Sequence, residues 1–370
     1  MKGLVSLPCL MVVGVSFAGA AVEWNDPQVN SVNRLPARTY TVPLADEEAA
    51  LTDELEPASP YRLSLNGMWK YSWAGNPDLR AKDFWKVGFD DADWFSIDVP
   101  SCVELRGFGS PGYTNIRYPH ADLSHPTNAA FATIRDRRSG KADYNPVSSY
   151  RRTFSVPETW RGRRIVLRFD GVYSAYYVWV NGVKVGYAED SKLPSEFDIT
   201  PYLNATRSEN LLCVEVYRWC DGSYLEDQDM LHYSGIFRSV RLYAEPQRAI
   251  RDFAVSTDVA PDFQSAAVSI KGLAGDWSAT LYDAAHAPVG TLSPQLSTLN
   301  ITRPRLWSAE DPYLYTLVVT NGEDIRACKV GVRKVERRGH TVLFNGRPIK
   351  YRGVNRHEHS PENGRTVSRA

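Results

Sequence analysis

Apolar and polar residues alternate through the middle of the chain, which predicts β-strands. Residues 165–169 (IVLRF) and 212–216 (LCVEV) place an apolar side chain at every second position, so that one face of each strand would be apolar. The Asn181-Gly182 pair stands between two valine-rich runs. It predicts a hairpin because both residues tolerate the positive φ of a type I′ turn. Many short strands without a helical period predict a sandwich or jelly roll over residues 61–245.

A second region of strand-like runs follows, at residues 246–336. Its four apolar runs have the spacing of an immunoglobulin-like sandwich of about ninety residues, and they read AVSI, SATLYD, YLYTLVV and CKVGVRKV. No group of reactive side chains occurs in this region. We therefore predict a domain that holds its neighbours in register.

The last apolar pattern lies close to the end of the chain. Ile349, Tyr351 and Gly353 alternate with basic residues, and the polar cluster 355–359 (NRHEH) follows at once. Polar groups at the C-terminal end of a strand are typical of the active site of a (β/α)₈ barrel. Such a barrel needs about 250 residues, so residues 337–370 can hold only a leading hairpin that turns at Asn345-Gly346 and the first strand or strands.

The first 60 residues lack sustained periodicity. Residues 1–20 contain one basic residue, an apolar run and a small-x-small ending, which predicts a secretory signal peptide and a periplasmic or secreted protein. The apolar run is shorter than the ~20 residues that a membrane span needs. Residues 21–60 are rich in proline and read as an extended arm lying on the next domain.

Composition excludes several classes of function. Lys plus Arg and Asp plus Glu both number 43, so no global field would attract nucleic acid or an anionic membrane, and a neutral substrate fits better. After export four cysteines remain, too few for a disulfide framework, and we expect free buried thiols. The many aromatic residues of the first β region are expected to be core residues.

Three long motifs carry a resemblance to a known family. LFNGRPIKYRGVNRHEHSPENGR (343–365), GYTNIRYP (112–119) and RWCDGSYLEDQDMLHYSGIFRSV (218–240) resemble family 2 glycoside hydrolases, particularly the large multidomain β-galactosidases, in the family's order. The opening EWNDPQVNSVNRLPARTY and the run LWSAEDPYLYTLVV at 306–319 agree with it. The resemblance implies a galactose-binding-like jelly roll, an immunoglobulin-like sandwich and the start of a catalytic barrel, in a β-galactosidase that hydrolyses terminal β-galactosides with retention.

The resemblance also implies three substrate-binding residues. Asn115 and His357 match residues that hydrogen-bond the sugar, and Asp221 matches a position that contacts both the sugar and a bound sodium ion. Amide and imidazole groups can donate and accept toward hydroxyls, and a carboxylate suits a hard cation. Taken alone, the DGSYLEDQDM run would read as a solvated acidic loop. Cys220 stands where serine is common, and Leu231-His232-Tyr233 replaces a Trp-containing run.

The catalytic machinery is expected to lie outside this chain. Retaining hydrolysis needs two carboxyl groups roughly 5 Å apart, and in the family both are glutamates on later barrel strands, as are the glutamate and histidine that bind a divalent cation, magnesium or calcium. Glu358 is expected to support the site rather than to react. The histidines of HEH are two apart, which excludes a helical zinc-protease motif. We therefore expect the 370 residues alone to be inactive.

Two alternatives remain open at this stage. The chain could be a noncatalytic carbohydrate-binding or scaffold module, which would bind galactosides without turnover. It could also belong to a related family 2 enzyme, a β-glucuronidase or a β-mannosidase. A homo-oligomer of a longer protein is compatible with either interpretation.

Overall fold

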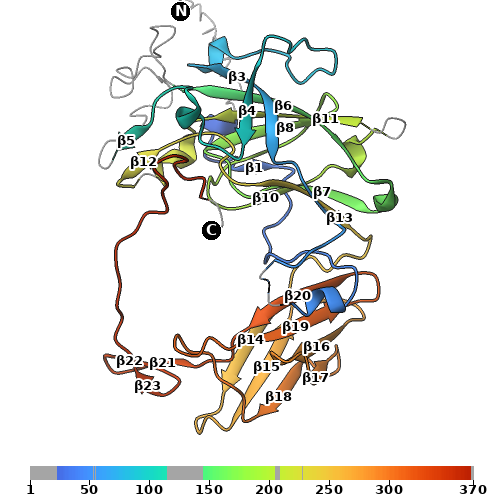
Figure 1. Cartoon of the computed structure of the whole chain (residues 1–370), viewed down its shortest axis with the longest axis vertical. Coiled ribbons are helices and arrows are strands. Elements are labelled where there is room, and N and C mark those ends of the chain that lie inside the picture. The colour runs from blue at the N-terminus through green and yellow to red at the C-terminus, as the bar shows by residue number, and fades with distance from the viewer. Residues whose placement is uncertain are drawn as a thin grey trace, which may run out of the picture.

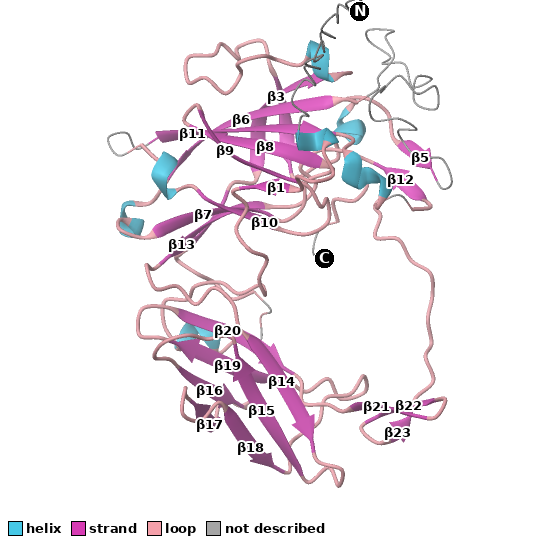
Figure 2. Ribbon diagram, turned by 180° about the vertical axis from the view of Figure 1, so that it is seen from behind, coloured by secondary structure: helices cyan, strands magenta, loops and turns pink. Residues whose placement is uncertain are grey.

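The computed structural model describes residues 23–52, 54, 56–114, 145–204, 209–226 and 228–367. These residues form two β-sandwiches, joined on one side by residues near the N-terminus and followed by a small three-stranded sheet and a long C-terminal segment (Figure 1). Strands and short 3₁₀ helices make up all the regular structure in the described ranges (Figure 2). The predicted signal peptide and Asn115 lie outside them.

The first sandwich pairs a seven-stranded sheet, ordered β1-β9-β8-β11-β6-β3-β4, with a four-stranded sheet, ordered β10-β7-β13-β2. All of its strand pairs are antiparallel. The strands of the larger sheet are β1 (Ser31–Val32), β3 (Gly67–Ala74), β4 (Phe95–Val99), β6 (Val147–Ser155), β8 (Ala175–Val180), β9 (Val183–Ala188) and β11 (Glu209–Tyr217). Those of the smaller sheet are β2 (Arg62–Ser64), β7 (Arg164–Phe169), β10 (Ser195–Asp198) and β13 (Val240–Glu245).

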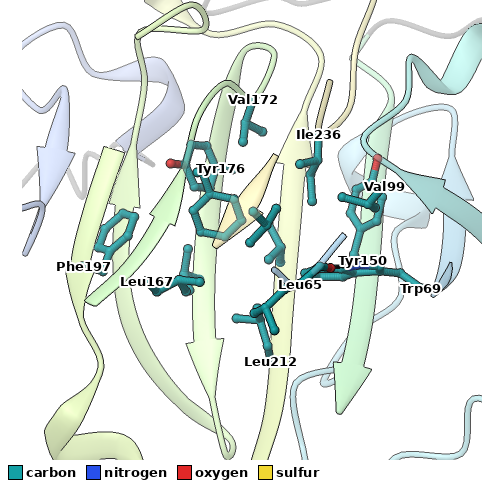
Figure 3. Close-up of a cluster of buried hydrophobic side chains, with 14 of the residues drawn as sticks. Leu65, Trp69, Val99, Tyr150, Leu167, Val172, Tyr176, Phe197, Leu212 and Ile236 are labelled. Atoms are coloured by element: carbon teal, nitrogen blue, oxygen red, sulfur yellow. Dashed lines mark hydrogen bonds between the residues drawn. The ribbon is translucent and has the colours of Figure 1, made fainter. Parts of the chain in front are cut away.

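The alternation of strand β11 is confirmed and has a physical reason. Leu212, Val214 and Val216 face the main core between the two sheets, which Figure 3 shows in close-up. Cys213 and Tyr217 face a second, aromatic cluster on the outer side of the larger sheet. Because both faces are covered, the strand reads as almost continuously apolar.

The predicted hairpin at Asn181-Gly182 joins β8 to β9. Both residues have positive φ, 52° and 86°, as the type I′ turn requires. The Asn181 amide also donates to the carbonyl of Tyr202 at 2.8 Å and accepts from the backbone N–H of Leu211 at 2.9 Å. The turn is thus held by tertiary contacts as well as by its local conformation.

The N-terminal arm contains a paired strand and 3₁₀ helices as well as extended segments. Its β1 pairs with β9 and extends the larger sheet. The 3₁₀ helices η1 (Glu23–Asn25) and η2 (Glu48–Ala50) lie in the same region, and others follow at η3 (Pro77–Leu79), η4 (Val103–Arg106), η5 (Glu158–Trp160) and η6 (Thr200–Tyr202).

The second sandwich faces the sheet β14-β15-β18 against the sheet β17-β16-β19-β20, with one apolar core between them. Its seven antiparallel strands fit the predicted immunoglobulin-like pattern. They are β14 (Ala254–Val259), β15 (Ser265–Lys271), β16 (Ser278–Tyr282), β17 (Pro288–Leu292), β18 (Thr298–Thr302), β19 (Tyr315–Thr320) and β20 (Ile325–Val330).

The C-terminal region corrects one expectation. A three-stranded sheet forms from β21 (Val335–Arg338), β22 (Thr341–Phe344) and β23 (Arg347–Pro348), with its second turn at Asn345-Gly346 as predicted. The strand expected at 349–353 does not form: the Ile349 N–H donates to the Val342 carbonyl of β22 at 3.1 Å, but residues 350–353 pair with no strand among the described residues. A strand needs a partner for its backbone groups, and the described residues offer none beyond Ile349.

The aromatic and cysteine residues follow the expectations. Trp69, Trp160, Trp179 and Trp219 are buried in the first sandwich, and Trp73, Trp85 and Trp94 are half-buried there. The four described cysteines are free thiols, of which Cys328 is half-buried and the other three are buried. Within the described ranges, no helix has the length and apolar character needed to cross a bilayer.

Candidate functional site

Asp221 begins the 3₁₀ helix η7 (Asp221–Tyr224), directly after the end of the buried strand β11. The preceding residue, Cys220, closes a capping box: its backbone N–H donates to the Ser223 hydroxyl at 3.0 Å, and its sulfur accepts from the backbone N–H of Ser223. The buried strand β11 and the capped turn that follows it therefore fix the position of Asp221. The loop is ordered in this way although it would read as solvated from its composition alone.

A second carboxylate faces Asp221. Glu189 follows strand β9, and potential ligand atoms of Glu189, Cys220 and Asp221 all lie within 4.8 Å of one another. The Tyr187 hydroxyl donates to one oxygen of Glu189. One oxygen of Asp221, Oδ2, is buried and has no hydrogen-bond partner. The site thus presents an acceptor that a hydroxyl group or a cation could satisfy.

Burial and mutual repulsion shift the titration of these groups. Burial, with the charge of nearby Asp221, raises the pKa of Glu189 to about 8, and burial also raises the pKa of Asp221. Two carboxylates this close repel each other when both are ionised, so a bound cation would stabilise their charged forms. Burial raises the pKa of the Cys220 thiol to about 12, which leaves it protonated and a poor ligand for a hard cation.

The donor set fits a sodium ion in part. Hard cations take oxygen ligands, and Asp221 and Glu189 supply two carboxylates on one side of such an ion. Ligands on the other side would have to come from elsewhere. The residues present agree with the expected role of Asp221 and add Glu189, which the sequence motifs do not single out.

Beneath the loop lies a buried polar network. Glu104 accepts from the N–H and the hydroxyl of Ser234, at 3.0 and 2.6 Å, and its carboxylate lies 3.8 Å from Arg218. Burial raises the pKa of Glu104, and Arg218 opposes that shift. The Arg218 guanidinium donates to the carbonyl of His232 at 3.1 Å. Arg218, His232 and Ser234 belong to the same sequence motif as Asp221, whereas no sequence motif singles out Glu104.

The run Leu231-His232-Tyr233, which departs from the Trp-containing run of the family, packs without disrupting the loop. His232 ends strand β12 (Met230–His232), which pairs with β5 (Gly112–Thr114). Its ring is 1 % exposed, and its Nδ1 lies 2.9 Å from the Tyr173 hydroxyl. Histidine therefore takes a buried aromatic position here with its polar edge satisfied.

The structure does not assemble the complete predicted site. His357 and Glu358 are exposed, and Glu358 pairs only with Arg356, at 3.2 Å. A hollow of about 810 Å³ includes Glu358 in its lining but neither Asp221 nor His357. Asn115 lies outside the described residues. In these ranges Asp221 alone of the predicted binding residues has a formed environment.

Comparisons with known proteins identify the two sandwiches. Residues 63–246 match the profile of the family 2 glycosyl hydrolase sugar-binding domain, and residues 239–333 match a second profile of the same family. A β-galactosidase of Priestia megaterium is 38% identical over 371 residues, covering 93% of this chain and 35% of that protein. One from Halalkalibacterium halodurans is 39% identical over 368 residues, covering 94% and 35%. The chain thus spans about a third of the length of these relatives.

Solved structures share the fold. A Ruminococcus gnavus β-glucuronidase superposes with a TM-score of 0.66 at 22% identity, over 84% of this chain and 50% of that one. A β-glucuronidase from an uncultured Clostridium species gives 0.63 at 24% identity, over 86% and 53%. From the matched profiles and the shared fold, the chain belongs to glycoside hydrolase family 2.

Proposed function

We propose that this chain is the substrate-binding N-terminal part of a β-galactosidase. The observation that carries the proposal is the carboxylate of Asp221, held by a capped turn with one buried oxygen lacking a donor. A sugar hydroxyl would satisfy that oxygen. The relatives named β-galactosidase, at 36–39% identity, support this substrate class.

The acidic character of the site favours a neutral sugar. A glucuronide carries a carboxylate, which would be repelled by Asp221 and Glu189 unless a cation or a protein base neutralised it. A galactoside carries only neutral polar groups, its hydroxyls and its ring and glycosidic oxygens, and meets no such penalty. The structural similarity to β-glucuronidases reflects the fold and does not change this preference.

Sodium at Asp221 and Glu189 belongs to the same proposal. The ion would lower the repulsion between the two carboxylates and present a positive charge to sugar oxygens. His357 and Asn115 would add hydrogen bonds from the start of the barrel and from the first sandwich. A divalent ion, with ligands on later strands, and export of the protein through its first 20 residues complete the proposal.

The chemical step would require two carboxyl groups on opposite faces of the sugar linkage, one to protonate the leaving oxygen and one to attack the anomeric carbon. Glu358, exposed and paired with Arg356, offers no such pair. This chain would bind and orient galactose without cleaving it.

Binding and turnover by the purified chain test the proposal together. We expect no release of nitrophenol from nitrophenyl β-galactoside. We expect galactose to bind with a Kd on the order of 1 mM in sodium chloride, more weakly in choline chloride of equal ionic strength. Asp221→Asn should abolish binding. Asp229→Asn is the matched control because it lies in the same loop and contacts the exposed Tyr113.

Three outcomes would contradict the proposal. Turnover by the chain would show that a catalytic pair is present. Unchanged galactose binding by Asp221→Asn would remove Asp221 from the site. Stronger binding of glucuronate than of galactose would favour the glucuronidase alternative.

A further inference from the structure

The chain ends its described course in a compact turn, Ser360–Thr366, here called the anchor turn. Ser360 and Gly364 exchange two backbone hydrogen bonds, of 2.7 and 2.8 Å, and the Asn363 N–H donates to the Ser360 hydroxyl at 3.2 Å. Gly364 has φ of +60°, a conformation that costs other residues energy. Local sequence therefore favours this turn.

The anchor turn rests on a defined surface of the first sandwich, here called the seat: Cys102, Leu105, Arg106, Tyr233 and Phe237. The Arg106 guanidinium donates to the Asn363 side chain at 3.2 Å, and the Thr366 hydroxyl donates to the Phe237 carbonyl at 3.0 Å. Cys102, Tyr233, Phe237 and Leu105 form one apolar cluster beneath it.

The fit at Gly364 is close on all sides. A Cβ there would lie 3.0 Å from Leu105, 3.2 Å from the sulfur of Cys102 and 3.2 Å from Tyr233. The Cys102 side chain is 1 % exposed, and its sulfur lies 4.0 Å from the Thr366 hydroxyl. The turn thus lies directly over a buried thiol.

The residues before the turn have no comparable support. Every residue from Lys350 to His359 is exposed, and Figure 1 shows this segment running from the β21–β23 sheet to the neighbourhood of β12. Within it the ring of His359 approaches Tyr233 of the seat, with ring centres 5.6 Å apart. The position of residues 355–359 therefore depends on the anchor turn.

We propose that the anchor turn is a positioning element that holds the NRHEH segment (355–359) beside β12, the strand that follows the Asp221 loop. The seat lies on the chain that leaves this loop: β12 starts at Met230, whose sulfur is contacted by Arg365, and Tyr233 follows the strand. Ser360 is three residues after His357, so their Cα atoms lie within about 11 Å. The inference rests on the proposed function, which assigns His357 and Asp221 to one sugar site.

Alkylation of Cys102 in the full chain measures docking without any sugar. We expect Gly364→Ala to raise the rate of Cys102 labelling by iodoacetamide at least tenfold, because the added methyl group must displace the seat. Gly339→Ala is the matched control, with φ of +61° and nothing within 4 Å of its Cβ. Labelling of Cys213, buried in the same sandwich, reports global opening and should stay unchanged. Arg106→Ala should give a smaller increase in Cys102 labelling.

Galactose binding by the same variants tests positioning. Gly364→Ala should weaken binding severalfold at an unchanged Tm, and Gly339→Ala should leave it unchanged. Cys102 labelling at the wild-type rate in both Gly364→Ala and Arg106→Ala would overturn the docking. Faster labelling with unchanged galactose affinity would overturn the positioning role and leave the proposed function intact. Absence of galactose binding in the wild type would instead overturn the proposed function, and labelling would still decide the docking.

Discussion

The two ends of the described chain meet the rest of the protein in opposite ways. The N-terminal arm passes between the sandwiches and contributes Val42, Leu44 and Ala50 to an apolar cluster that both sandwiches share. The C-terminal segment is exposed from Lys350 to His359 and touches the first sandwich only where it ends. One end completes an interface, and the other leaves its apolar side chains uncovered.

The arm also organises buried charge. Arg38 binds both oxygens of Glu196, at 3.0 and 2.8 Å, and Arg168 and Arg251 bind the same carboxylate. Farther along, Arg326 donates to the Thr41 carbonyl of the arm at 3.2 Å. Each charged group of this junction therefore has a partner, which avoids the cost of an unpaired buried charge.

The apolar side chains of the C-terminal segment, in contrast, are not covered. Tyr351 and Val354 are 75 % and 88 % exposed, and no charge network surrounds them among the described residues. Exposed apolar side chains in one segment mark a surface for interaction. The comparison shows that buried ion pairs mark the internal interface of the two sandwiches, while exposed apolar residues mark a surface on which another segment would pack.

The largest effect should come from breaking the charge network between the sandwiches. Arg326 is fully buried and binds Asp324 at 2.9 Å and Glu245 at 3.5 Å. Arg326→Ala should destabilise the protein by about 3–5 kcal/mol because two buried carboxylates lose a cation. Urea unfolding measures the loss. The exposed pair Arg248–Glu323 provides the control: Arg248→Ala should change the free energy of unfolding by less than about 0.5 kcal/mol.

A loss for Arg326→Ala no greater than that for Arg248→Ala would contradict the contrast between the buried network and an exposed pair. Two separate unfolding transitions in Arg326→Ala would show that the charge network couples the two sandwiches.

Acid should weaken the same junction through Glu196. Burial alone would raise its pKa, but Arg38, Arg168 and Arg251 outweigh that effect and lower it to about 2. The stabilisation is present above the ordinary pKa of 4.5 and is lost as the pH falls toward 2. A shift of this size corresponds to about 3 kcal/mol.

Thermal unfolding of the wild type and of Glu196→Gln, from pH 6 down to pH 2, measures this contribution of Glu196 to stability. The variant should be less stable at pH 6, and the difference should shrink as the pH falls from 4.5 toward 2. A difference independent of pH would show that Glu196 acts by packing alone.

The strands could be predicted from sequence because their signals are local. Period-two alternation located β7 and β11, and Asn181-Gly182 and Asn345-Gly346 located two turns that require positive φ. The strand expected at 349–353 failed because alternation gives a strand its faces but not its partners. The pairing of β1 with β9 was missed for the same reason, since it joins residues more than 150 positions apart.

The candidate site was predictable only where a motif contained it. Asp221 came from the resemblance, and its placement in a capped turn agrees with a binding role without testing it. Glu189 lies 32 positions earlier and meets Asp221 only through the sheet order β9-β8-β11, which brings the chain after β9 close to the chain after β11. Glu104 and Arg218 form a buried pair that no spacing in the sequence reveals.

The smallest effect on stability should come from the uncovered end. Replacing Tyr351 and Val354 together by serine should change the free energy of unfolding by less than about 0.5 kcal/mol, because neither side chain is buried in the folded protein. The same replacement should reduce self-association at high concentration, since it removes exposed apolar surface. Val42→Ala in the arm is the contrasting control. It should lower the free energy of unfolding by about 1–3 kcal/mol, because Val42 is buried. Sedimentation and urea unfolding measure the two properties, and a large stability loss in the serine variant would mean that the segment packs on the sandwiches in solution.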